Sequence, residues 1–135
     1  MVVSHSVSEK IDSPAGSVSL WDNGILHTHT KAEMEINLPI CEEIHQMALK
    51  ITGGKPYPNL FTFTKYVLPD EESRNFMLLP KRLALTCADA IVVTSLAQKI
   101  IGNFYLKINR PPIPTKLFSK QEEAEKWLLQ FVKTT

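Results

Sequence analysis

Two histidines separated by a single residue are the clearest candidates for chemistry in this 135-residue chain. His27 and His29 lie in a short segment that alternates apolar and polar residues, as a half-buried strand does. Residues two apart on a strand share a face, so both imidazoles can reach one metal ion. The other potential ligands are Glu33, Glu35, His45 and His5, and no spacing selects among them. A polar strand face is therefore the simpler interpretation, and we expect neither a metal nor another cofactor.

The two cysteines give no sign of a nucleophile. Cys41 and Cys87 are far apart, have no neighbouring Cys or His at a motif spacing, and lie in apolar stretches that we predict to be helical. We interpret each as a buried free thiol, which packs as a small apolar group. The chain also lacks the G-x-S-x-G pattern of a nucleophile elbow. We therefore expect a protein that is not an enzyme.

The first half of the chain predicts a hairpin, a helix and a strand. Residues 17–21 and 25–30 flank Asp22-Asn23-Gly24, and Asn-Gly tolerates the positive φ angles of a tight hairpin turn. Pro39 to Ile51 carries apolar residues at helical spacing and is followed by two glycines. Asn59 to Lys65 alternates and is rich in aromatic and β-branched residues, which favours a strand.

The second half predicts the remaining elements of an alternating α/β chain. A helix opens at 69–72 and is broken by Pro80, and residues 90–94 form a buried strand. Ser95 begins a helix that carries Leu96, Ile100 and Phe104 on one side, and we expect this helix to be buried. A strand at 115–118 then leads to a last helix, with Ser119 and Glu122 as its capping box. Its buried stripe comprises Ala124, Trp127, Leu128 and Phe131.

The resulting order, β-β-α-β-α-β-α-β-α, predicts an α/β fold with a mixed, largely parallel sheet layered with helices. We expect a flexible N-terminal lead-in over residues 1–16 and a single domain over 17–135. With 15 basic and 14 acidic residues the net charge is +1, which argues against nucleic acid as a partner. No apolar run is long enough to span a membrane, and residues 1–10 lack the apolar core of a signal peptide. We therefore expect a cytoplasmic protein.

The element order and three segments of the chain resemble the STAS/SpoIIAA-like domains. The segments are residues 20–26, residues 103–118 and residues 122–128, and they look like an uncharacterised SpoIIAA-like family common in Bacteroidetes. These motifs are a turn, a helix-to-strand crossover and an amphipathic helix, which are structural features. The resemblance therefore implies a bacterial protein of this fold, but it identifies no functional residue in this chain.

Relatives with this fold, the anti-sigma-factor antagonists, are phosphorylated on a serine after the strand that precedes the second helix. Here that region holds Asp70, Glu71, Glu72 and Ser73, but the Asp-Ser/Thr-Ser-Gly motif is absent. A phosphate on Ser73 would meet two carboxylates, with Arg74 offsetting part of the repulsion. A solvated first helical turn explains these residues better than a phosphoswitch does.

The leading hypothesis is a non-catalytic, STAS-like regulatory or interaction domain, with an unknown protein or a second copy of the chain as its partner. Four consecutive apolar residues cannot all face inward on one helix, so some remain for a partner or ligand: Phe76, Met77, Leu78 and Leu79. Trp21, at the hairpin turn, is expected to be more exposed than Trp127 and to add a surface anchor. The first alternative is a small-molecule or lipid-binding module, which a cavity of about 300 Å³ or more would indicate. The least favoured is a metal-dependent enzyme that uses His27 and His29.

Overall fold

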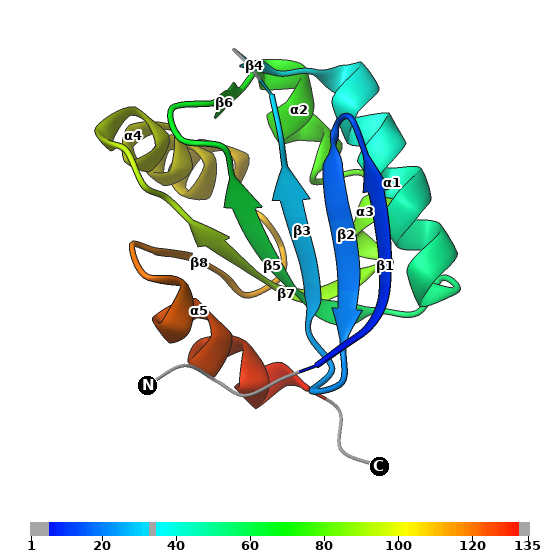
Figure 1. Cartoon of the computed structure of the whole chain (residues 1–135). Coiled ribbons are helices and arrows are strands. Elements are labelled where there is room, and N and C mark those ends of the chain that lie inside the picture. The colour runs from blue at the N-terminus through cyan, green and yellow to red at the C-terminus, as the bar shows by residue number, and fades with distance from the viewer. Residues whose placement is uncertain (1–5, 33–34, 133–135) are drawn as a thin grey trace.

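One six-stranded mixed sheet organises the protein (Figure 1). The computed structural model describes residues 6–32 and 35–132. In sheet order the strands are β1 (Val7–Ser13), β2 (Gly16–Trp21), β3 (Leu26–Thr30), β5 (Tyr57–Phe63), β7 (Thr86–Val92) and β8 (Thr115–Phe118). The first three are antiparallel neighbours, and the pairs from β3 to β8 are parallel. A small parallel pair, β4 (Glu35–Ile36) with β6 (Leu68–Pro69), lies outside this sheet. The predicted α/β class with a largely parallel sheet is confirmed.

The helices form layers on both faces of the sheet. They are α1 (Leu38–Thr52), α2 (Glu71–Phe76), α3 (Pro80–Leu83), α4 (Leu96–Phe104), the π-helical turn η1 (Tyr105–Asn109), α5 (Gln121–Leu128) and the 3-10 turn η2 (Leu129–Phe131). Alternate strand residues such as Phe61 and Ile91 face α1, α2 and α4, whereas Leu60 and Ala90 face α5. The chain therefore has one thick helical layer and one face that α5 covers only in part (Figure 1). None of the described helices is long and apolar enough to cross a membrane.

The predicted hairpin is confirmed, but a third antiparallel strand precedes it. β1 pairs with β2 from Val7 to Ser13, so the expectation of a flexible lead-in over residues 1–16 is wrong for this stretch. A turn at Pro14-Ala15 joins the two strands, and Gly16 follows it as the first residue of β2. Gly16 has φ 148°, and a Cβ there would lie 2.0 Å from the backbone oxygen of His29. Such a backbone conformation favours glycine strongly. Residues 1–5 of the predicted lead-in are outside the described residues.

The helix α1 is confirmed, and its ends have clear physical causes. The Asn37 side chain accepts a hydrogen bond from the Ile40 amide and caps the first turn. Gly53 ends the helix in the left-handed region with φ 63°. The helix predicted to begin near Pro69 is two short helices, α2 capped by Asp70 and α3 begun by Pro80. Cys87 belongs to strand β7, so its prediction as helical is wrong.

Two helix predictions need correction in detail. The residues Leu96, Ile100 and Phe104 do share one side of α4, but this side faces solvent, with 74%, 59% and 45% of each residue exposed. The inner side carries Gln98 and Gly102, and Tyr105 follows them in η1. The predicted Ser119–Glu122 capping box does not form, because α5 starts one residue later with Lys120 at its N-cap and no side-chain cap.

The interior consists of two apolar clusters on opposite faces of the sheet. Residues 21, 25, 60, 88, 90 and 92 pack with Ala124 and Leu128 of α5, and Trp127 and Phe131 lie at the edge of this cluster. The second cluster joins β2 and β3 to α1. Trp21 is only 4% exposed and its indole Nε1 donates to the Ser19 hydroxyl, so its prediction as a surface anchor is wrong. Burying such a large ring at the hairpin end stabilises the docking of α5.

Candidate ligand cavity

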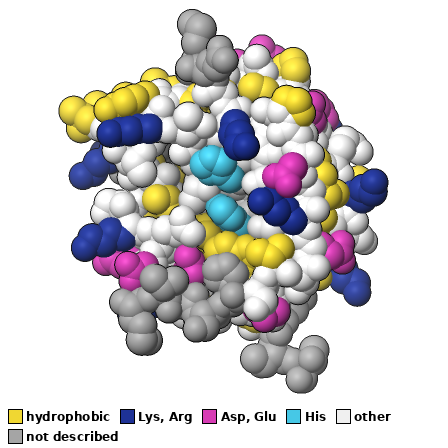
Figure 2. Space-filling model, viewed as in Figure 1, with side chains coloured by type: hydrophobic (Ala, Val, Ile, Leu, Met, Phe, Trp, Pro, Cys, Tyr) yellow, Lys and Arg dark blue, Asp and Glu magenta, His cyan; other side chains and the backbone are white. Residues whose placement is uncertain are grey.

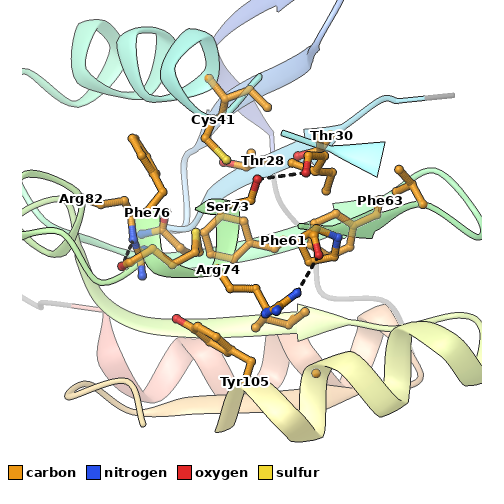
Figure 3. Close-up of a pocket in the computed structure, with 18 of the residues that line it drawn as sticks. Thr28, Thr30, Cys41, Phe61, Phe63, Ser73, Arg74, Phe76, Arg82 and Tyr105 are labelled. Atoms are coloured by element: carbon orange, nitrogen blue, oxygen red, sulfur yellow. Dashed lines mark hydrogen bonds between the residues drawn. The ribbon is translucent and has the colours of Figure 1, made fainter. Parts of the chain in front are cut away.

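A cavity of about 150 Å³ lies between the sheet and the thick helical layer (Figure 3). Its floor comes from β3, β5 and β7, and its walls come from α1, α2, α3, α4 and η1. The volume is half of the roughly 300 Å³ that we expect for a small-molecule or lipid-binding module, but it is of the order that holds one benzene-sized molecule. The cavity is therefore too small for a lipid-sized ligand but adequate for a small molecule.

The lining is mainly apolar and contains three phenylalanines. Phe61 and Phe63 rise from β5, and Phe76 closes the cavity from the end of α2 (Figure 3). The His45 ring meets the Phe76 ring edge-on, with 5.7 Å between centroids. Such a set of ring faces and edges favours a flat apolar guest.

The apolar run predicted as a patch divides between the cavity and the surface. Phe76 is 4% exposed and lines the cavity with the half-buried Met77, Leu78 is half-buried, and Leu79 is 40% exposed. The run spans the end of α2 and the start of α3 and is not one helical face. It closes one side of the cavity, which agrees with a ligand role better than with a broad surface patch.

A buried ion pair supports the wall of the cavity near α3. Arg82 donates from Nη1 and Nη2 to the two carboxylate oxygens of Asp89, at 3.0 and 2.5 Å. Asp89 is fully buried and Arg82 is 6% exposed. The Thr86 hydroxyl donates to Asp89, and the Arg82 Nε donates to the Met77 carbonyl oxygen. The carboxylate is thus neutralised within the protein, and the pair holds the segment 77–89 in place.

The Tyr105 hydroxyl is a buried polar group on the cavity wall. Tyr105 is 5% exposed, and its hydroxyl has no hydrogen-bond partner of good geometry among the described residues. Burial raises the pKa of Tyr105 to about 12, although the Arg82 guanidinium nearby opposes the shift. Figure 3 shows the ring extending from η1 towards the other lining side chains. The Arg82 guanidinium can only donate hydrogen bonds, so it cannot accept the proton of the Tyr105 hydroxyl. That proton is therefore available to an acceptor on a bound molecule.

Arg74 is the second donor on the wall. Its Nη1 donates to the Pro69 carbonyl oxygen, and its guanidinium lies 5.5 Å from the centroid of the Phe104 ring. The Nε is buried without a hydrogen-bond partner, and Arg74 has no carboxylate partner in the described part of the chain. A half-buried guanidinium with a buried, unpartnered Nε and no acid beside it favours an anionic or strongly accepting ligand.

Cys41 and His45 are one helical turn apart on α1 and both line the cavity. Burial raises the pKa of the Cys41 thiol, a hydrogen bond with the Ser73 side chain opposes this shift, and the carboxylates of Asp70 and Glu42 add to it. Burial, followed by Lys81, lowers the pKa of His45. The thiol is therefore protonated and the imidazole neutral at neutral pH. No hydrogen bond joins the two side chains within the described residues, so they lack the geometry of an activated nucleophile.

Ser73 is buried and not available to a kinase in this structure. It is 3% exposed, and its hydroxyl donates to the carbonyl oxygen of Ile36 at 2.9 Å. Its backbone amide donates to the Asp70 cap at 2.8 Å. The interpretation of a solvated turn is wrong for Ser73, although Glu71 and Glu72 are exposed, and phosphorylation of Ser73 stays a prediction that its burial disfavours. The hydrogen bond from the Ser73 hydroxyl therefore connects α2 to β4.

His27 and His29 lie on the opposite face of the sheet from the cavity. Two histidine side chains are visible near the centre of the face in Figure 2. The Thr62 hydroxyl bridges them, at 2.8 Å from Nε2 of His27 and 2.7 Å from Nδ1 of His29. His45 is buried on the other face and cannot join them. The described residues contain no group of three potential metal ligands, and Glu33 and His5 lie outside them. Burial, with a smaller effect of Lys31, lowers the pKa of His29.

A family model matches residues 19–132 of the chain, and its description is a domain of unknown function, DUF7793. The chain belongs to this family. No curated protein matches the DUF7793 chain significantly. Among solved structures, the fold is similar to that of an uncharacterised protein of the DUF3478 family with a SpoIIAA-like fold from Shewanella loihica PV-4, with a TM-score of 0.56 and 13% identity. The match covers 95% of this chain and 98% of the other. The similarity establishes the SpoIIAA-like fold of this DUF7793 domain.

Sequence reasoning missed the polar residues of the DUF7793 cavity, although two of them left a signal. Asp89 interrupts an otherwise apolar strand, where a carboxylate requires a partner. Tyr105 lies on the side of its helix opposite to the apolar residues that we had expected to be buried. Arg74 and Arg82 had no such signal, because arginines on short helices are usually solvated.

Proposed function

We propose that this DUF7793 domain is a non-catalytic binding domain for a small, mainly apolar molecule that carries hydrogen-bond acceptor oxygens. The observation that supports it most is an apolar cavity with two buried donors, the Tyr105 hydroxyl and the Arg74 Nε, that the described residues leave unsatisfied. Unsatisfied donors in a buried site are unfavourable, so a guest that accepts from them gains more than apolar contact.

The charge of the wall favours an acid as this guest. Arg82 is neutralised by Asp89, whereas Arg74 lines the cavity without a carboxylate beside it in the described part of the chain. The volume limits the molecule to roughly one aromatic ring or a short branched chain. The fitting class is thus a small monocarboxylic acid with a ring or branched tail.

Binding without chemistry is the role that the lining residues favour. The cavity contains a protonated thiol and a neutral imidazole that are not hydrogen-bonded to each other, and the lining residue Arg82 is already paired with the carboxylate of Asp89 behind it. A catalytic site would instead bring a nucleophile or base together with an orienting partner. The ligand would act by holding α2, α4 and η1 in one arrangement around it.

The test is a titration of the purified domain with benzoate, isovalerate, the neutral analogue benzamide and the cation benzylammonium. We expect saturable binding with benzoate or isovalerate at least tenfold tighter than benzamide, and no binding of benzylammonium. Tyr105→Phe weakens benzoate and benzamide alike, whereas Arg74→Gln removes the preference for benzoate. Lys50→Gln, which neutralises an exposed cation on α1, is the matched control and leaves both affinities unchanged.

Native mass spectrometry of protein from its own host completes the test. A bound small acid in stoichiometric amount supports the proposal. A bound transition metal, a long-chain lipid, or no saturable binding of any titrant contradicts it.

A further inference from the structure

The outer side of α4 and η1 carries an exposed apolar stripe. We define it as Leu96, Ile100, Phe104 and Ile108, which recur every four residues and are exposed by 74, 59, 45 and 65%. The inner side of the same helix faces the sheet through Gln98, Gly102 and Tyr105. The helix therefore turns a mixed polar and apolar face inward and an apolar face to solvent. Four aligned apolar side chains on one exposed helix face indicate a docking surface.

Basic residues accompany the stripe. Lys99 and Lys107 are exposed and flank it along the same helix, and Arg110 follows at its end. Residues 90–121 contain five basic residues and no acidic one. The helix α2, which packs against η1, carries the exposed carboxylates Glu71 and Glu72 in its first turn. Hydrophobic and basic side chains lie side by side at the corner of Figure 2 that α4 occupies in Figure 1.

An exposed aromatic residue extends the surface at the start of α4. Tyr66 is 67% exposed and has a φ of 71°, a left-handed conformation that a tyrosine rarely adopts. The Gln98 side chain holds this loop, because its Nε2 donates to the carbonyl oxygens of Thr64 and Val67 at 3.3 and 3.0 Å. Lys65 lies 5.0 Å from the Tyr66 ring centroid. The loop thus presents an aromatic and a basic side chain beside the stripe.

We infer that this surface docks on an anionic lipid bilayer. An amphipathic helix with an apolar stripe and flanking lysines binds at the interface of such a membrane, where Tyr side chains also favour the headgroup level. The lysines and Arg110 supply the attraction to negative headgroups, which is strongest at low ionic strength. The inference is independent of the molecule that occupies the cavity.

A second copy of the chain fits the surface less well. A two-fold interface through the stripe brings Lys99 and Lys107 close to the same residues of the other copy, with no carboxylate of residues 90–121 to compensate. The four side chains offer roughly 400 Å² of apolar surface, about half of what one partner buries in a standard interface. Insertion into a bilayer needs no complementary protein surface.

Co-sedimentation of the full chain with vesicles tests the inference. We expect binding to phosphatidylcholine vesicles that contain 30% phosphatidylglycerol, weakening with added salt, and at least tenfold weaker binding to pure phosphatidylcholine. The apolar variant Leu96→Ser/Ile100→Ser and the charge variant Lys99→Glu/Lys107→Glu each lose at least tenfold. The matched control is Leu49→Ser/Lys50→Glu on α1, where Leu49 is 41% exposed, and it stays within twofold of the natural protein.

Circular dichroism checks that each variant is folded. If the apolar variant is unfolded, the vesicle binding of the charge variant alone tests the inference. Equal binding to both kinds of vesicle, or an equal loss in the α1 control, would overturn the inference. So would a dimer in sedimentation equilibrium that the stripe variants convert to a monomer, because the stripe would then be covered by a second copy. Absence of vesicle binding together with capture of an acidic protein through the stripe would likewise overturn it.

Discussion

Arg82 and Asp89 form a bidentate ion pair inside the protein, seven residues apart in the chain and joined across the turn between α3 and β7. Asp89 is fully buried, and Arg82 also stacks at 5.8 Å on the Phe61 ring that lines the cavity. The pair therefore links the sheet to the short helices that close the cavity. Its position makes the cavity wall sensitive to a change at either residue.

Removal of one partner is expected to be strongly destabilising. Asp89→Asn or Arg82→Met leaves the other charge buried without compensation, and we predict a loss of about 3–5 kcal/mol in the free energy of unfolding. The double variant Arg82→Met/Asp89→Leu, which removes both charges, recovers most of this loss. Urea denaturation measures all three. If a single variant lost less than about 1 kcal/mol in the free energy of unfolding, Arg82 and Asp89 would not form the buried ion pair described.

The Tyr105 hydroxyl predicts an unusual response to substitution. Because the buried hydroxyl has no partner of good geometry, Tyr105→Phe leaves the free energy of unfolding without ligand unchanged or raises it by up to about 1 kcal/mol. The same change weakens binding of a small acid about tenfold. Thermal unfolding with and without benzoate separates the two effects. A loss of stability above about 1 kcal/mol in the ligand-free protein would show that the hydroxyl already has a protein partner.

The raised pKa of Tyr105 also predicts a pH dependence. The folded protein keeps the phenol proton up to a pKa of about 12, whereas the unfolded chain releases it near 10. The contribution of Tyr105 to stability is therefore full below pH 10 and falls as pH rises from 10 to about 12, by about 2–3 kcal/mol. The measurement is the difference in unfolding free energy between the natural protein and Tyr105→Phe across this pH range. Because both proteins contain the same lysines, the difference reports the contribution of Tyr105 alone. A difference independent of pH would contradict the burial of the phenol.

Ser73 is predicted to be a structural residue. Ser73→Ala removes the hydrogen bond to the Ile36 carbonyl oxygen and lowers the free energy of unfolding by about 1–2 kcal/mol. Ser73→Asp places a charge in the same buried position and is more damaging, above about 3 kcal/mol. Chemical denaturation compares the pair, with Glu72→Ala on the exposed side of the same turn as the neutral control. A well-folded Ser73→Asp variant would reopen the question of a phosphoswitch.

The fold was predictable from local signals that tertiary structure reinforces. The Asn-Gly turn and the Gly53 helix end each combine a pattern with a geometric requirement, and each is observed. The apolar strand predicted at 90–94 is also present, but it runs from Thr86 to Val92. Trp21 was misplaced because a turn residue is usually exposed, whereas the packing of α5 against the hairpin end buries it.

The site was not predictable, because it depends on which face of each element turns inward. For α4 the apolar periodicity alone suggested that Leu96 and Ile100 point to the core. In the structure the buried residues are instead Gln98 and Tyr105. Gln98 donates hydrogen bonds to the backbone of the 64–67 loop. The donor residues of the cavity wall that we single out come from α2, α3 and η1, and η1 lies far along the chain from the other two. No single motif records such an assembly.

The thiol of Cys41 offers an independent probe of the cavity. Its partial burial and raised pKa predict slow reaction with a disulfide reagent at pH 7.5, increasing steeply above pH 9. A bound acid would slow the reaction further by filling the cavity that Cys41 lines. The Cys87→Ser variant leaves Cys41 as the only thiol for this assay. Rapid modification that benzoate does not change would contradict the placement of Cys41 at an occupied cavity.

The most direct test of a ligand-binding role is a two-dimensional NMR titration of the labelled domain with benzoate. We predict saturable shifts at the aromatic and methyl groups that line the cavity, above all Phe61, Phe76, Ile101 and Tyr105, and none at His27 or His29 on the opposite face. Shifts absent from these groups at saturating acid, or centred on the two histidines, would contradict it.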